Sequence, residues 1–180
     1  MRRYLFFMLP ALLLAGAGCD DDNETDLSLI SEIDKQFILA ATGDALFQVN
    51  AGQVATSGTT IKGIQDYGEE MTKSHTQAGQ ELQKLAADRH VQIPTTLSDD
   101  RQQQLDSLSM YTDENLDTLY LNQMVVAQQR VIRTLEIETT NGNDIELKQW
   151  ASDRLPIVRQ FAERARTMRD SLVTPDPQKK

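Results

Sequence analysis

Cysteine, histidine and basic residues are scarce in this chain, and each scarcity excludes a class of protein. Cys19 is the only cysteine among 180 residues, so neither an internal disulfide framework nor a site built from several thiolates can form. The two histidines, His75 and His90, show no nucleophile–base spacing and leave little for acyl transfer. The sequence contains no phosphate-cradling glycine-rich loop and no dinucleotide-binding fingerprint. The residues therefore favour a protein without enzymatic activity.

The deficit of basic residues bears on possible partners. The chain has 18 Lys and Arg residues against 27 Asp and Glu residues, which gives a net charge of −9. Nucleic-acid binding requires Lys and Arg to displace counterions from phosphates, and an acidic chain is also repelled by anionic lipid surfaces. We therefore expect no nucleic-acid partner, and we expect membrane contact to come from a lipid anchor.

The N-terminal segment has the features of an export signal. An uncharged run over residues 4–15 follows Arg2 and Arg3 and precedes the small residues of Gly16-Ala17-Gly18-Cys19. A basic start, an apolar run and small residues are typical of a secretory signal peptide. The run is shorter than the roughly 20 apolar residues that span a bilayer. Residues 1–18 are therefore predicted to be a signal peptide.

Cys19 occupies the position that bacterial lipoprotein signals give to their lipidated residue, and the segment resembles such a signal. It departs from the pattern at Gly16, where leucine is usual; Leu14 lies two places earlier. Two acyl chains suffice for stable anchoring, since each buried methylene contributes about 0.8 kcal/mol. The prediction is an exported lipoprotein of the bacterial cell envelope, held by Cys19 on a periplasmic or cell-surface face. A simple cleaved secretory signal is the alternative.

Residues 19–30 are predicted to form an acidic, disordered tether, because residues 20–26 are almost all polar and mostly acidic. Acidic residues directly after a lipidated cysteine resemble the surface-export signal of lipoproteins in the Bacteroidetes. In enteric bacteria, by contrast, Asp at the second mature position is associated with retention in the inner membrane. The destination membrane stays open. Residues 174–180, with two prolines and two lysines, are predicted to be a disordered tail.

Between the tether and the tail, residues 31–173 are predicted to form one helical bundle domain. Apolar residues recur at helical spacing, and turn or capping signals divide them into helices over about 31–56, 61–90, 98–110, 112–141 and 144–172. No alternating run predicts a strand. Pro156 is expected to kink the last helix near Ser152. The resulting fold class is all-α, a four-helix bundle with a short linking helix between the second and third long helices.

The buried faces of the first two helices follow from the same spacing. On the first helix the apolar stripe contains Ile30, Ile33, Phe37, Ala40, Phe47, Ala51 and Val54. On the second it contains Ile61, Ile64, Gly68, Met71, His75, Ala78, Leu82 and Leu85. His75 is the one strongly polar residue in that second stripe. It is open at this point whether His75 is a ligand, a switch or a core residue with hydrogen-bonded partners.

Four segments give the chain a resemblance to a known family. They are Gln48-Val49-Asn50-Ala51-Gly52, Met71-Thr72-Lys73-Ser74-His75-Thr76, Asp117-Thr118-Leu119-Tyr120 and Leu155-Pro156. The chain resembles, over roughly residues 37–172, a large bacterial family of exported proteins known only as domain of unknown function four-one-four-two. The resemblance implies a ferritin-like four-helix fold.

The resemblance also implies that this chain has lost a polar cluster. The family commonly has Glu at Gln48, Asp at Ser74, and His at Gln128 and Phe161, and only His75 keeps its identity. Two amides, one phenyl ring and one imidazole fall short of the three good donors that a divalent metal normally needs. No metal and no cofactor are therefore predicted.

His75 is interpreted as a core residue whose ring nitrogens need partners from other helices. The candidate polar core cluster consists of His75, Gln48, Gln128, Asp117 and Tyr120. A neighbouring Asp117 would favour the charged imidazole, whereas burial would favour the neutral one. The hypothesis is that His75 helps to set the stability of the bundle between mildly acidic and neutral pH.

The sequence favours a non-enzymatic envelope lipoprotein, in which a tether presents the bundle as a binding or structural module. Its protein partner cannot be derived from the sequence. The alternative is a ferritin-like metal-binding protein or oxidoreductase relic of the bacterial envelope. That alternative would require His75 to gather a metal together with carboxylates such as Glu70 or Asp117.

Overall fold

Five helices make up the computed structural model, which describes residues 30–173. They are α1 (Glu32–Gly58), α2 (Lys62–Asp88), α3 (Asp99–Ser109), α4 (Asp113–Asn141) and α5 (Ile145–Val173). No strand occurs in this range, and no helix within it is long and apolar enough to cross a membrane. The predicted signal peptide, Cys19, the tether up to residue 29 and the tail of residues 174–180 lie outside the described residues.

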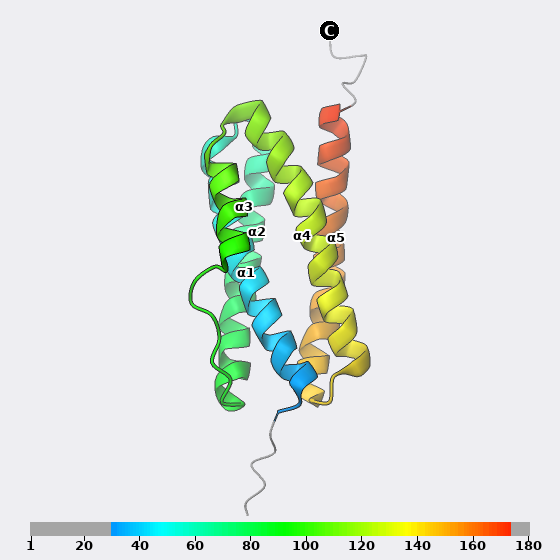
Figure 1. Ribbon diagram of the computed structural model, residues 1–180. Helices are drawn as coiled ribbons and strands as arrows, with labels where there is room; N and C mark the ends of the chain where they lie inside the picture. Colours follow the sequence, from blue (N-terminus) through cyan, green and yellow to red (C-terminus); the bar gives the residue numbers. More distant parts are fainter. Residues whose placement is uncertain (1–29, 174–180) are drawn as a thin grey trace, which may run out of the picture.

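The four long helices lie side by side (Figure 1). α1 and α5 run in one direction along the bundle, and α2 and α4 run in the other. Short turns at residues 59–61 and 142–144 make two helical hairpins, α1–α2 and α4–α5. The connection from α2 to α4 returns along the length of the bundle and contains α3, which packs against α1 and α4.

The long helices differ in how their starts are capped. Ser31 caps α1, since its hydroxyl oxygen accepts from the backbone N–H of Asp34 at 3.2 Å and its hydroxyl donates to the Asp34 carboxylate at 2.6 Å. α2 begins after Ile61 without a side-chain cap, and the Thr59 hydroxyl accepts from the Ile61 N–H within the preceding turn. α5 continues as a helix through Pro156.

The apolar core consists of two clusters separated by a polar layer at mid-height. One cluster fills the end of the bundle at the α1–α2 turn, and it includes Phe47, Tyr67, Met71, Leu116, Tyr120 and Met124. The other fills the end where α1 begins, and it includes Phe37, Ile38, Leu82, Leu85, Leu135 and Leu147. The buried polar side chains between them are Asp44, Gln48, His75, Gln128 and Arg154.

The second predicted stripe matches the structure better than the first. The residues from Ile64 to Leu85 in the α2 stripe are all buried, and only Ile61 is exposed, at 39%. On α1 the prediction is wrong for Ile33, which is 41% exposed, and for Ala40, which is also exposed. α1 contacts α2, α3 and α4, so its buried face is broad and shifted from the predicted stripe.

α1 and α2 approach each other closely at a pair of glycines. A Cβ atom on Gly68 would lie 2.8 Å from the backbone oxygen of Gly52, and one on Gly52 would lie 2.7 Å from the backbone oxygen of Gly68. Backbone atoms cannot move aside as a flexible side chain can, so both positions exclude a side chain. Gly79, also on α2, has open space around its Cβ position.

The close contact gives the first prediction. Gly68→Ala forces α1 and α2 apart and should lower the free energy of unfolding by about 1–3 kcal/mol. In the matched control, Gly79→Ala, the added methyl group contacts nothing. This substitution should raise the free energy of unfolding by about 0.5–1 kcal/mol, because alanine has a higher helix propensity than glycine. Chemical denaturation of both variants measures the difference. Equal stabilisation by the two substitutions would contradict the close contact.

Candidate functional site

A pair of amides lies at the centre of the polar layer. Gln48 on α1 and Gln128 on α4 are both fully buried, and Gln128 Nε2 donates to Gln48 Oε1 at 2.5 Å. The same nitrogen lies 3.3 Å from the sulfur of Met71 on α2. The pair therefore connects the two hairpins through a neutral hydrogen bond. Neutral amides of this kind offer no general acid or base.

His75 lies in the same layer as an uncharged core residue. It is 4% exposed, and its Nε2 has no hydrogen-bond partner among residues 30–173. Its ring centroid lies 6.4 Å from that of Phe161. Burial lowers the pKa of His75 to about 3 from the ordinary 6.5, and the positive charge of Arg154 contributes to this shift. Among the alternatives left open by the sequence, the geometry fits a neutral core histidine.

Arg154 is the charged group that acts on the pKa of His75, and it joins α5 to α2. Its side chain is buried, and Nη2 donates to the backbone oxygen of Ser74 at 3.0 Å and to the Ser74 hydroxyl at 3.2 Å. The guanidinium also lies over the Trp150 ring, 5.7 Å from its centroid. A second positive charge on His75 would therefore be opposed both by burial and by this fixed cation.

Two members of the predicted polar cluster lie elsewhere. Asp117 is buried in the first turns of α4 beside Thr59, and Tyr120 packs edge-to-face against Tyr67 with centroids 6.1 Å apart. The α4 residues that share a cavity with His75 are Val131, Thr134 and Leu135, of which Val131 comes first along the helix. At 1.5 Å per helical residue, Asp117 is roughly 20 Å away along α4. The expectation that Asp117 or Tyr120 bonds to His75 is wrong.

A small internal cavity adjoins His75. It has a volume of about 20 Å³ and is lined by Asp44, His75, Thr134 and Arg154 together with apolar side chains. This volume is close to that of one water molecule, so the cavity cannot hold an organic cofactor. Across residues 30–173, no group of three or more His, Cys, Asp or Glu side chains is placed to hold a metal ion.

The sequence reading missed Asp44, which forms a buried ion-pair cluster at the edge of the layer. Asp44 is 5% exposed; Arg101 on α3 pairs with it directly, and Arg130 Nε lies 3.4 Å from the same carboxylate oxygen. The Arg101 guanidinium also covers the Phe47 ring at 4.7 Å. In the sequence, Asp44 lies three residues after Ala41 and four before Gln48. This helical spacing is the signal that places Asp44 on the buried face.

Glu138 is a second missed residue, at the end of the bundle where α1 begins. The side chain is fully buried on α4. In its ionised form, neither carboxylate oxygen has a hydrogen-bond partner among residues 30–173. Burial, followed by the neighbouring charge of Asp34, raises the pKa of Glu138 to about 7. Asp34 accepts hydrogen bonds from the backbone N–H groups of Asn143 at 2.8 Å and Asp144 at 3.3 Å. Protonated Glu138 can donate to Asp34, which explains how two acids share this site.

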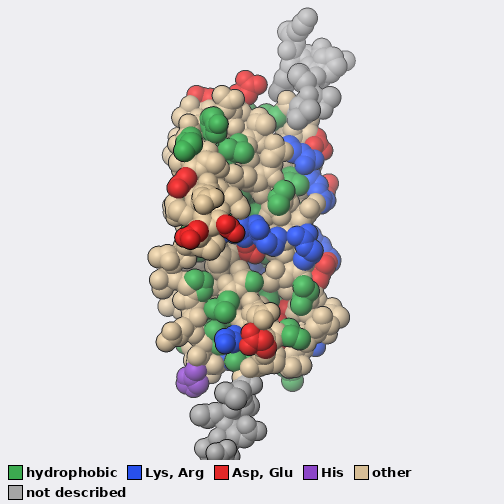
Figure 2. Space-filling view, in the orientation of Figure 1, with side chains coloured by type: hydrophobic (Ala, Val, Ile, Leu, Met, Phe, Trp, Pro, Cys, Tyr) green, Lys and Arg blue, Asp and Glu red, His purple; other side chains and the backbone are tan. Residues whose placement is uncertain are grey.

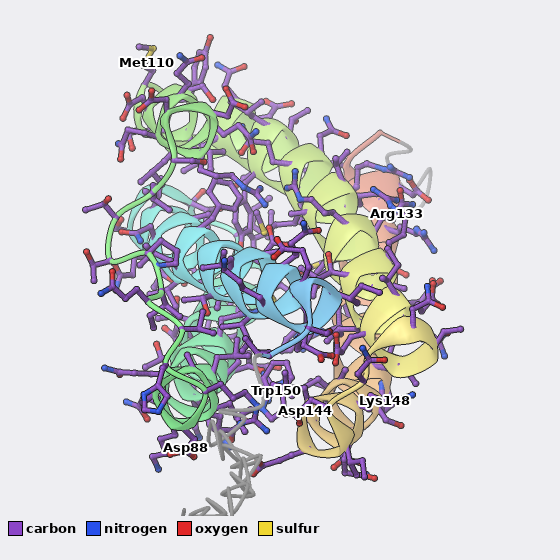
Figure 3. All side chains as sticks on the ribbon, turned by 60° about the horizontal axis from the view of Figure 1, so that its bottom comes forward. Asp88, Met110, Arg133, Asp144, Lys148 and Trp150 are labelled. Atoms are coloured by element: carbon purple, nitrogen blue, oxygen red, sulfur yellow. The ribbon has the colours of Figure 1, made fainter. Side chains whose placement is uncertain are left out.

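An open cleft lies at the same end. It has a volume of about 630 Å³ and is lined by the start of α1, the end of α2 and the start of α5. Asp88 and Asp144 lie at the ends of two of these helices (Figure 3). Arg89 donates to both carboxylate oxygens of Asp144 at 2.7 Å and to Glu146 at 2.9 Å. The lining is acidic overall, and its one arginine is already engaged.

The fold and the polar layer define the class of this protein: a helical bundle with a neutral, amide-bonded centre. The family described as Domain of unknown function (DUF4142) matches residues 22–168, and the chain belongs to this family. The family resemblance predicted from the four sequence segments is thereby confirmed. No curated protein and no solved structure shows a significant match to the chain.

The burial of His75 gives the second prediction. Because its folded-state pKa lies below its ordinary value, the unfolded chain takes up a proton first as the pH falls. The contribution of neutral His75 to the free energy of unfolding is therefore complete above about pH 6.5. It declines toward pH 3 by up to about 1.4 kcal/mol per pH unit. His75→Gln should remove this decline. Denaturation of both proteins from pH 7 to pH 4 measures it, and parallel curves would contradict it.

Glu138 requires a control, because it acts in the opposite direction. Its folded-state pKa is raised from 4.5 to about 7, so its contribution to stability is present below about pH 4.5 and is lost as the pH rises toward 7. The two groups therefore partly cancel in the wild type. In a Glu138→Gln background the opposing slope is absent, so the decline caused by His75 should appear undiminished in the parent protein, while the difference made by His75→Gln should be the same in both backgrounds.

Proposed function

We propose that this chain is a lipid-anchored protein of the bacterial cell envelope whose helical bundle is a non-enzymatic binding or structural module. The observation that carries the non-enzymatic part is the composition of the polar layer. Gln128 Nε2 donates to Gln48 Oε1, while Gln48 Nε2 and Gln128 Oε1 have no hydrogen-bond partner among residues 30–173. The low pKa of His75 keeps its imidazole neutral. None of the three is placed as a proton donor or acceptor toward an open cavity large enough for a substrate.

The ferritin-like form of the bundle belongs to the same proposal. Ferritin-like folds combine antiparallel helix pairs with one long crossover connection. Here the α1–α2 and α4–α5 hairpins are joined by the long segment that contains α3, and α2 and α4 run in the same direction (Figure 1). The topology therefore supports a ferritin-like relationship, while the donor atoms that a metal centre would require are replaced by amides and a phenyl ring.

The anchor is supported by the sequence of residues 1–19 and by the polarity of the bundle. α1 begins directly after residues 19–30, so those residues would separate the bundle from the bilayer. The end of the bundle nearest to them has an acidic cleft lining, with Asp34, Asp88, Asp144 and Glu146. Such a surface is repelled by anionic headgroups, so attachment to a membrane would depend on acylated Cys19.

The third prediction tests the anchor. When the full chain is expressed in a bacterium that lipidates exported proteins, the wild type should partition into the detergent phase. Cys19→Ser should move it to the aqueous phase, because two acyl chains carry the membrane affinity. Thr76→Ser, an exposed conservative change on α2, is the control and should behave as the wild type. Exported wild-type protein that stays in the aqueous phase would contradict the proposal.

The non-enzymatic part is tested on the same purified material. Metal analysis and thermal unfolding with and without a chelator should show no bound transition metal and no change in melting temperature. A stoichiometric metal whose removal lowers the melting temperature would instead support the alternative, a ferritin-like metal-binding protein.

A further inference from the structure

A groove on the side of the bundle combines an apolar floor with unpaired arginine donors. It has a volume of about 360 Å³ and lies between α1, the segment before α3, and α4. Leu39, Gly43 and Pro94 contribute to its apolar part, and Asp44, Arg101 and Arg130 contribute its charges. Pockets for small molecules commonly start at about 300 Å³ and pair an apolar lining with a few placed polar groups.

The charges of the groove do not balance. Asp44 is the one carboxylate of the lining, and it faces two guanidinium groups. Arg101 is only 11% exposed, packs on Phe47 and pairs directly with Asp44, so the carboxylate is largely used by this partner. The lining therefore keeps an excess positive charge, although the whole chain carries −9.

Arg130 carries that excess. Its side chain is 37% exposed, and its contact with Asp44 is the longer one, at 3.4 Å from Nε. The Nε itself is buried without a hydrogen-bond partner among residues 30–173. Burial and the nearby charge of Arg133 lower the pKa of Arg130, as expected for a cation that is short of anionic partners.

The groove is open where a ligand body would lie. A Cβ atom on Gly43 would meet nothing within 4 Å, so the helix surface at this position is uncovered. Thr134 lines the groove one turn after Arg130 and adds a hydroxyl. Lys and Arg side chains form a band across the middle of this face of the molecule (Figure 2). The band is short and surrounded by acidic and neutral surface, which suits a small anion better than a polyanion.

We infer that this groove binds a small organic anion, with its carboxylate or phosphate group on Arg130 and Thr134 and its short apolar body over Gly43 and Pro94. Guanidinium groups bind carboxylates and phosphates through paired N–H donors. The inference names a ligand class for the binding module proposed above. It does not depend on the Cys19 anchor, so its failure and the failure of the anchor are separately measurable.

The fourth prediction tests the groove by calorimetric titration of the full chain carrying Cys19→Ser. Octanoate and octyl phosphate should bind, whereas octanol, which lacks the charge, and inorganic phosphate, which lacks the apolar body, should each bind at least about tenfold more weakly. Vesicles of phosphatidylglycerol should not bind. Tight binding of inorganic phosphate, equal binding of octanol, or binding of the vesicles through Arg130 would overturn the inference.

Two substitutions locate the binding in the groove by independent means. Arg130→Gln removes the charge, and Gly43→Leu fills the open space without touching a charge; each should weaken octanoate binding by about tenfold or more. The control is Arg159→Gln, which removes an exposed α5 arginine paired with Glu136 and should leave the affinity unchanged. Thermal unfolding confirms that each variant is folded. Unchanged affinity in folded Arg130→Gln and Gly43→Leu would contradict the assignment.

Discussion

The hydrogen bond between Gln48 and Gln128 joins the two helical hairpins at the centre of the bundle, and the surrounding layer depends on it. A buried amide without a partner costs about 1–3 kcal/mol, so each glutamine requires the other. Their pairing fixes the distance between α1 and α4 at the level where the core changes from one apolar cluster to the other. Asp44 precedes Gln48 by one turn of α1. It lies between the small cavity beside His75 and the surface groove, and it lines both.

This division of the core explains how a strongly acidic chain buries ionisable groups. The Arg154 guanidinium donates to the backbone oxygen and hydroxyl of Ser74, and its charge together with burial keeps His75 uncharged. Glu138, at the end where α1 begins, stays protonated up to about pH 7. The two titrating groups have opposite effects on stability as the pH falls, so the bundle is less sensitive to mild acidity than either group alone would make it.

The sequence predicted the helices and most of the α2 face, because spacing and turn residues determine them locally. It did not predict the shifted face of α1, since that depends on three neighbouring helices. Glu138 could not be distinguished from a solvated acid without knowing which helices cover it, whereas the spacing of Asp44 from Ala41 and Gln48 is a local signal of the buried face. Gln48 and Gln128 entered the candidate site through the family resemblance, and no spacing rule would have selected them. Asp117 was a candidate partner of His75 because it lies on another helix, but periodicity does not give the level along the bundle, and about four turns of α4 separate Asp117 from His75.

The most direct test of the amide pair is a double-mutant cycle on unfolding free energy with Gln48→Met and Gln128→Met. Each single substitution leaves one buried amide without its partner and should destabilise the protein by about 1–3 kcal/mol. The double substitution removes both amides together, so its cost should fall short of the sum of the single costs by about 1 kcal/mol or more. Additive costs would show that the two side chains do not depend on each other and would contradict the central role of this contact.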